Sequence, residues 1–205
     1  MHRLFLFICL SGLAATAYAQ PCNIGKVESV SGQAFVERHA QKFRLDTDIL
    51  LCANDKFVTD ESSVAKLRLR DGSLITVGKD SEFIILDYHI YKNKPNNAQF
   101  ELIKGAFRSV TGFITQRSHR YEVKTRMATI GIRGTDFWGG FGLTENGLDV
   151  VMLDGHGVYV TDNNGVTVEL DKPGLGTTVT ETTPPSVAKK WGDDKVAKAI
   201  ATITP

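Results

Sequence analysis

The sequence has little that would support redox, metal or nucleic-acid chemistry. Only three of its 205 residues are cysteines, and none forms a Cys-x-x-Cys pair, which argues against a thiol redox centre. Its histidines occur singly, without the spacing of a zinc site, so we predict no metal centre. Basic and acidic residues number 24 and 23. Because this balance gives no large positive field, we predict no nucleic-acid partner.

Common catalytic motifs are missing as well. The chain has no Gly-x-Ser-x-Gly turn, and its glycine-rich segment at 131–135 lacks the Gly-Lys-Ser/Thr of a phosphate loop. The carboxylate pairs Asp46/Asp48 and Asp193/Asp194 lie in polar stretches typical of solvated surface. We therefore predict no catalytic residues and no cofactor. A hydrolase that unites two carboxylates distant in sequence remains an alternative.

The N-terminal residues have the composition of an export signal. Met1-His2-Arg3 is basic, the run LFLFICLSGLAATA is apolar, and Ala17-Tyr18-Ala19 gives the small-x-small cleavage pattern. We expect cleavage after Ala19 and a periplasmic mature chain, with secretion as the alternative. The apolar run is shorter than the roughly 20 residues of a membrane span. No later stretch could span a membrane, so we expect no stable membrane insertion after cleavage.

Cleavage would leave Cys22 and Cys52 as the cysteines of the mature chain, because Cys9 lies within the signal. An even number of cysteines in an oxidising compartment favours a disulfide. The bridge would close a loop of about thirty residues, for which the chain-entropy model gives roughly 3–4 kcal/mol. Two unrelated buried thiols are the alternative.

Most of the remaining chain reads as short strands separated by turns. Residues 64–69 alternate apolar and basic side chains, the period of a half-buried strand. Asp71-Gly72-Ser73 then predicts a two-residue hairpin turn before a partner strand at 74–77. Residues 81–86 read as a strand buried on both faces.

Helical periodicity is nearly absent before residue 184. We therefore predict an all-β fold: a single domain over residues 20–180 built from many short strands, as a solenoid-like or sandwich-like β roll. The tail, 181–205, is predicted either to fray or to form a short helix. That helix would start near the cap-like Pro184-Pro185-Ser186, with an apolar stripe of Val187, Trp191 and Ile200.

An arginine interrupts the apolar segment at 126–142. Counting by two from Ile130 places Gly131, Arg133 and Thr135 on the face opposite the isoleucines. The Arg133 guanidinium carries five donors, and Gly131 and Gly134 would permit close approach or positive φ. We favour a structural role, in which Arg133 braces nearby carbonyls or a carboxylate.

Recognition is the alternative role for this segment. Arginine is a favoured anchor for ligands and partners. Trp138 follows closely, and an aromatic shelf beside an arginine would suit a sugar or a peptide. Core packing is the other reading of Trp138.

The chain resembles the FecR domain family over roughly residues 25–175, because six motifs typical of that family occur in order. Asn54-Asp55 departs from the Gly-Asp that the family often has. The six segments are Gly32-Gln-Ala-Phe-Val, Ala53 to Thr59, Ala65 to Val77 with its Asp71-Gly72-Ser73, Leu102 to Arg108, Val123 to Phe137 with its Arg133-Gly134-Thr135, and Val150 to Val160.

The resemblance implies an all-β, solenoid-like domain of the bacterial envelope without catalytic residues. Family members that regulate sigma factors carry a cytoplasmic helical segment and a transmembrane helix before this domain, whereas here we predict a cleavable signal. The leading hypothesis is a stand-alone binding module for an envelope protein or for a cell-wall glycan or peptide. The alternatives are a soluble sensor that works with a separate membrane regulator, and the carboxylate hydrolase.

Overall fold

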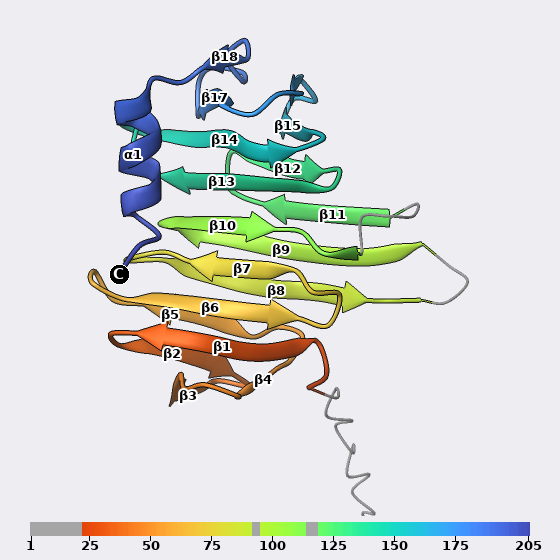
Figure 1. The fold of residues 1–205 in the computed structure, drawn as a ribbon, viewed down its shortest axis with the longest axis vertical. Helices are drawn as coiled ribbons and strands as arrows, with labels where there is room; N and C mark the ends of the chain where they lie inside the picture. Colours follow the sequence, from red (N-terminus) through yellow and green to blue (C-terminus); the bar gives the residue numbers. More distant parts are fainter. Residues whose placement is uncertain (1–21, 92–94, 114–118) are drawn as a thin grey trace, which may run out of the picture.

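The computed structural model describes residues 22–91, 95–113 and 119–205, which fold into two stacked β-sheets (Figure 1). The predicted export signal, 1–19, lies outside these residues. In the described part, sheet A has the strand order β18-β17-β14-β13-β10-β7-β6-β1-β4, and sheet B has the order β16-β15-β12-β11-β9-β8-β5-β2-β3.

The strands are short, as the turn signals predicted. Sheet A consists of β1 (Gly25–Ser31), β4 (Leu50–Leu51), β6 (Val64–Leu69), β7 (Leu74–Val77), β10 (Ala106–Val110), β13 (Thr135–Phe141), β14 (Gly147–Gly155), β17 (Leu175–Thr180) and β18 (Lys189–Lys190). Sheet B consists of β2 (Ala34–Arg38), β3 (Gln41–Arg44), β5 (Lys56–Thr59), β8 (Glu82–His89), β9 (Asn96–Lys104), β11 (His119–Lys124), β12 (Ala128–Ile132), β15 (Val158–Asp162) and β16 (Thr167–Leu170). The helix α1 spans Asp193–Ala201.

The chain passes repeatedly between the two sheets as it climbs the long axis of the molecule. In Figure 1 the strands progress from red and orange at the bottom to blue at the top, and α1 then runs back down to the C-terminus. Paired strands in the described ranges are antiparallel, with the exception of β9 and β11, which are parallel. The prediction of an all-β, solenoid-like roll with a short C-terminal helix is confirmed.

The β6–β7 hairpin forms where it was predicted, but its turn is longer than two residues. Arg68 pairs with Leu74, and the amide of Leu69 donates to the carbonyl oxygen of Ser73 at 2.9 Å. Gly72 has a φ of +84°, the left-handed conformation that a three-residue hairpin loop places on glycine. The longer turn brings Asp71 and Ser73 into one hydrogen-bonded unit.

The core lies between the sheets and contains a continuous row of aromatic rings. Phe83 and Phe100 of sheet B stack with centroids 5.6 Å apart. Phe83 also lies 5.4 Å from Phe107 of sheet A, which meets Phe137 edge to face at 5.3 Å. These side chains are fully buried, so they bind the two sheets together through the ring contacts expected of aromatic pairs.

The outer faces of the two sheets differ. Helix α1 lies on sheet A (Figure 1), where Trp138 and Val151 pack against Trp191 and Ala199. On sheet B, Ile84 and other outward side chains of β8 are only half-buried. The prediction that residues 81–86 are buried on both faces was therefore wrong, because no described element covers that face.

The C-terminal helix begins later than the sequence suggested. It starts at Asp193 after Gly192, which has no side-chain cap. Ser186 instead accepts a hydrogen bond from Thr177 through its carbonyl at 2.6 Å, and Val187 is 85% exposed. The helix position follows from packing against sheet A, where Trp191 is buried before the helix starts.

Candidate functional site

The Asp71-Gly72-Ser73 turn is closed by its own side chains. The Ser73 hydroxyl donates to Asp71 Oδ2 at 2.5 Å, and the Ser73 amide donates to Oδ1 at 3.1 Å. The Tyr88 hydroxyl, from β8, donates to the same Oδ1 at 2.9 Å. Burial and the neighbouring Asp71 charge raise the pKa of Tyr88 above its ordinary value of 10.0. The Asp71 carboxylate therefore links the hairpin of sheet A to a strand of sheet B.

This turn is bonded to the next connection, which follows β10. The amide of Phe113 donates to the Asp71 carbonyl at 3.0 Å. The amide of Gly112 donates to the Ser73 hydroxyl at 2.8 Å. These bonds hold side by side two segments that lie about forty residues apart in sequence.

Thr135 extends this hydrogen-bond network to the following connections. Its hydroxyl donates to the Gly157 carbonyl at 2.8 Å and accepts from the Gly157 amide at 3.2 Å. Its amide donates to the Thr111 hydroxyl at 2.8 Å, and the Thr111 amide donates back to the Thr135 carbonyl at 3.2 Å. Thr135 is 3% exposed, so its two bonds to Gly157 are buried, and those to Thr111 are partly buried.

We call Asp71, Ser73, Thr111, Thr135 and Gly157 the turn ladder. They lie in or directly beside the β6–β7, β10–β11, β12–β13 and β14–β15 connections, which stack along one edge of the sandwich, at the right in Figure 1. Each step joins groups that are buried or partly buried, where an unmade hydrogen bond is costly. The motif residues at these positions thus tie four successive turns into one edge.

Arg133 does not lie inside this edge. Its side chain is exposed, and its guanidinium faces the hydroxyl of Tyr159. The pKa of Tyr159 is raised by its hydrogen bond to Glu169, and the nearby Arg133 lowers it in part. The side chain therefore contacts a tyrosine hydroxyl, whereas we favoured carbonyls or a carboxylate as its partners. The Arg133 backbone is bonded within the fold: its amide donates to the Gly157 carbonyl at 3.0 Å, and its carbonyl accepts from the Thr135 hydroxyl at 3.2 Å.

The other residues of the segment have separate positions. Gly131 lies on the outer face of sheet B, paired with Glu122 and Tyr159 across its two neighbours. A side chain there would meet nothing nearer than 4.0 Å, so the surface beside Tyr159 is open. Gly134 has a φ of +62° where the chain crosses from sheet B to sheet A, a conformation that favours glycine.

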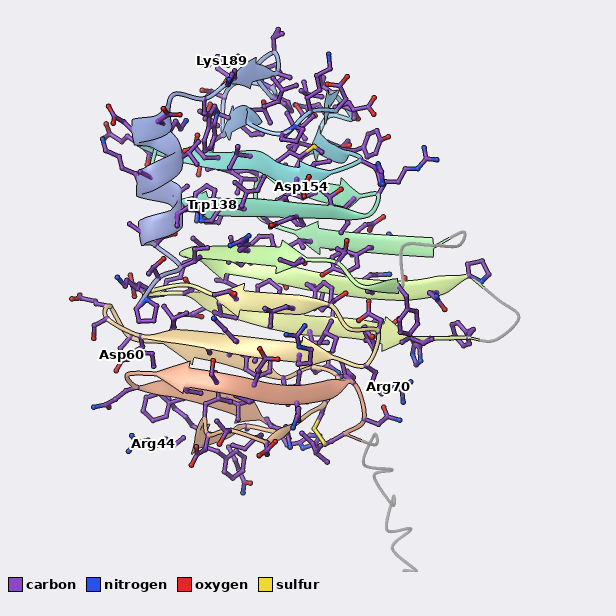
Figure 2. The ribbon with its side chains drawn as sticks, viewed as in Figure 1. Arg44, Asp60, Arg70, Trp138, Asp154 and Lys189 are labelled. Atoms are coloured by element: carbon purple, nitrogen blue, oxygen red, sulfur yellow. A yellow bond between two sulfur atoms is a disulfide. The ribbon has the colours of Figure 1, made fainter. Side chains whose placement is uncertain are left out.

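Trp138 is buried beneath α1, as Figure 2 shows. Its indole nitrogen donates to the Thr202 hydroxyl at 3.0 Å, and its ring meets Trp191 at 6.3 Å in a T-shaped pair. A shelf for a sugar or peptide needs an accessible ring face, whereas Trp138 is 0% exposed. Of the two readings of this residue, packing matches its position.

A disulfide joins Cys22 and Cys52 at the N-terminal end of the sandwich, as predicted. Close by, Arg38 makes two hydrogen bonds to the buried Asp55, at 2.7 and 2.8 Å, and a third to the Leu50 carbonyl at 2.8 Å. Asp55 also accepts from the Cys52 amide at 2.8 Å. Arg38 is thus an arginine that braces a carboxylate and a carbonyl, which is the role we had assigned to Arg133.

Two cavities meet at Arg70, at the end of the molecule that holds the disulfide (Figure 2). The first, about 300 Å³, is lined by Asn23, Ile24, Ala53, Arg70, Asp87, Tyr88, His89 and Ile90. The second, about 470 Å³, shares Asn23 and Arg70 with the first and is mainly apolar. Arg70 is exposed, so its guanidinium can reach a ligand in either cavity.

The buried carboxylates of the described residues are engaged within the fold. Asp55 pairs with Arg38, Asp71 with Ser73 and Tyr88, and Asp149 with Lys195 at 2.6 Å. Asp162 accepts from the backbone amides of its own turn. Residues 22–91, 95–113 and 119–205 hold no cluster of three His, Cys, Asp or Glu side chains that could bind a metal ion.

Several residues of this network were missed by sequence reasoning. Tyr88 and Thr111 carry no motif of their own, and only the fold brings them to Asp71 and Thr135. Asp55 did carry a signal, because it follows Asn54 where the family often has Gly-Asp. Within the described ranges, no helix is long and apolar enough to cross a membrane.

Comparison with known proteins agrees with the predicted family. Residues 55–156 match the family model described as FecR protein. Two crystal structures of a "putative anti-sigma factor" from Parabacteroides distasonis ATCC 8503, at 2.50 and 1.65 Å resolution, each match with a TM-score of 0.55 and 16% identity over 69% of this chain. The chain spans 62% of the length of that protein, and at this identity the likeness shows the fold alone. No curated protein sequence matches.

Proposed function

Because this chain carries a FecR domain over residues 55–156, we propose that it is a regulatory, non-enzymatic binding module of the bacterial envelope. The buried carboxylates support this proposal, since each accepts hydrogen bonds from donors within the fold, and Asp162, which also lines a cavity, is held by the amides of its own turn. A carboxylate hydrolase would instead need two such groups facing a shared open space.

The observation that carries the proposal is the contrast, along the turn edge, between buried side chains that hold the connections together and the exposed side chain of Arg133. The turn ladder holds the connections rigidly, whereas Arg133 stands exposed beside Tyr159 and Glu169. An exposed arginine beside a partly exposed tyrosine, on a base held by hydrogen bonds, has the composition of a recognition anchor. The open surface over Gly131 leaves room for a partner group next to the Tyr159 ring. We propose that a partner protein or a cell-wall glycan or peptide docks here.

The test is retention of ligands by immobilised protein spanning residues 22–205. Solubilised envelope proteins and soluble cell-wall fragments are passed over the wild type, Arg133→Glu, and the matched control Lys172→Glu, which reverses an exposed charge elsewhere. We expect retention by the wild type and the control but not by Arg133→Glu. Equal retention by all three proteins, or none by the wild type, would contradict the proposal.

A soluble sensor that works with a separate membrane regulator is the second candidate. The fold shared with the Parabacteroides protein favours a regulatory setting. Cross-linking in intact cells distinguishes the two: a sensor is captured on an integral membrane protein in a signal-dependent manner. A stand-alone module is captured on the same ligand whether or not the signal is present.

A further inference from the structure

The apolar groove beside Arg70 has the chemistry of a second ligand site, separate from the Arg133 surface. The groove is shallow and open to solvent, with a volume of about 470 Å³. Leu50, which is 55% exposed, Gly25 and Cys22 contribute to its apolar surface. Such an accessible leucine next to a concave surface offers burial to an apolar group.

The charged side chains around this groove are all basic. They are Lys26, Arg68 and Arg70, with no acidic residue in the lining. Lys26 is paired with Asp48 at 2.6 Å, and Arg68 with Glu28 at 2.6 and 3.1 Å. These pairs occupy two of the three cations.

Arg70 is the third cation, and its guanidinium has no side-chain partner in the described part of the chain. On its other side, the smaller cavity contains Asp87, which is itself paired with His89 at 2.9 Å. An anion is repelled by Asp87 and meets no acidic group in the apolar groove. The groove side of Arg70 is therefore the favourable position for a carboxylate, which a guanidinium can bind through two hydrogen bonds.

The groove wall is held in place before any ligand arrives. The disulfide fixes Cys22, the Ile24 amide donates to the Leu51 carbonyl at 3.2 Å, and the Arg70 amide donates to the Ile24 carbonyl at 2.9 Å. A preformed wall lowers the entropy lost on binding.

We propose that this groove binds a single-chain anionic amphiphile, a long-chain carboxylate, with the chain over Leu50 and the carboxylate on Arg70. The charge complementarity and the apolar lining together select this class. A free inorganic anion would contact Arg70 but not the apolar lining, and an uncharged chain would contact the apolar lining without pairing with Arg70. This inference does not rest on the proposed function, because it concerns different residues.

The test is calorimetric titration of laurate, below its micelle concentration, into the disulfide-bonded protein. We expect one site per chain. Arg70→Gln should weaken binding by about tenfold or more, the scale of a lost charge-assisted hydrogen bond. Leu50→Ser should weaken binding by a similar factor, because it removes apolar surface that the chain would bury. Arg44→Gln, which removes an exposed arginine outside the groove, should bind as the wild type does. Dodecyltrimethylammonium, with the opposite charge, should not bind.

Each alternative occupant overturns the proposal in a distinct way. Binding to anionic phospholipid vesicles without binding of monomeric laurate would indicate a membrane surface. A dimer that Leu50→Ser dissociates, with no laurate bound to either form, would indicate a second copy of the chain. Equal laurate affinity in the wild type, Arg70→Gln and Leu50→Ser would place the site elsewhere. Thermal melting of each variant, with Arg70→Lys as a conservative control, identifies loss of binding that results from unfolding.

Discussion

Thr135 and Gly157 are joined by two hydrogen bonds through one hydroxyl, at 2.8 Å to the carbonyl and 3.2 Å from the amide. Gly157 lies in the β14–β15 connection, and Thr135 begins β13. The bonds therefore lock together two consecutive crossings between the sheets. The threonine of the Arg-Gly-Thr motif holds the edge of the sandwich, while the side chain of the arginine beside it is exposed next to Tyr159.

Stability should fall at high pH because of two buried tyrosines. Burial raises the pKa of Tyr88 and of Tyr121 above the ordinary value of 10.0. Above that pH the unfolded chain releases protons that the folded chain retains, so the free energy of unfolding falls as pH rises. Below about pH 10 the contribution is complete.

Urea unfolding between about pH 8 and 11.5 measures this effect. We expect Tyr121→Phe to flatten the decline, because it removes one of the two groups. Tyr91→Phe, at a position that is 41% exposed, should leave the slope unchanged. The same slope in the wild type and in Tyr121→Phe would refute the assignment.

The Cys22–Cys52 disulfide should contribute to stability mainly through the unfolded chain. It spans 30 residues, and for a loop of that length the chain-entropy model gives roughly 3–4 kcal/mol. We expect the double variant Cys22→Ser/Cys52→Ser to lose about that much free energy of unfolding in urea. Reductant should lower the stability of the wild type but not of the variant. A variant as stable as the oxidised wild type would contradict this account.

Lys195 should hold α1 on sheet A. Its ammonium donates to Asp149 at 2.6 Å and lies 4.1 Å from the centroid of Trp191. Asp149 is fully buried, so Lys195→Met would leave an uncompensated charge. Because the lysine is itself 32% exposed, we expect a loss of about 1–3 kcal/mol, below the roughly 3–5 kcal/mol of a fully buried pair.

Urea unfolding of Lys195→Met is compared with that of Lys198→Met, which changes an exposed lysine of the same helix. Lys198→Met should stay within about 0.5 kcal/mol of the wild type. Adding Asp149→Asn to Lys195→Met should recover part of the loss, because the amide carries no charge. Equal stability of the two single variants would show that the ion pair does not hold the helix.

Strands were predictable where alternation survives burial on one face, as at β6. The β7 strand, in which three successive residues are buried, followed from the hairpin turn instead. The direction in which the Thr135 side chain points was not predictable. Counting by two placed Thr135 with Gly131 and Arg133, but the chain crosses between sheets at Gly134, which ends the count. Arg133 and Gly131 do face outward, and Thr135 turns inward. A two-residue period holds within a strand and carries no information across a turn.

Tertiary contacts explain the other differences. The Asp71-Gly72 signal placed the hairpin correctly, yet the partner of Asp71 is Tyr88 on the other sheet, which no local pattern identifies. Likewise, Ser186 resembled a helix cap, but it bonds to Thr177 and Thr178 of β17 instead. Trp191 then sets the helix position by packing on Trp138.

The most direct test of the central claim compares Thr135→Val with Arg133→Ala in urea unfolding. Thr135→Val keeps the shape of the side chain but leaves the buried amide of Gly157 without its partner, so we predict a loss of about 1–3 kcal/mol. Arg133→Ala should change the free energy of unfolding by no more than about 0.5 kcal/mol. The reverse order, with Arg133→Ala the more destabilising, would show that the arginine braces the fold and would contradict the account.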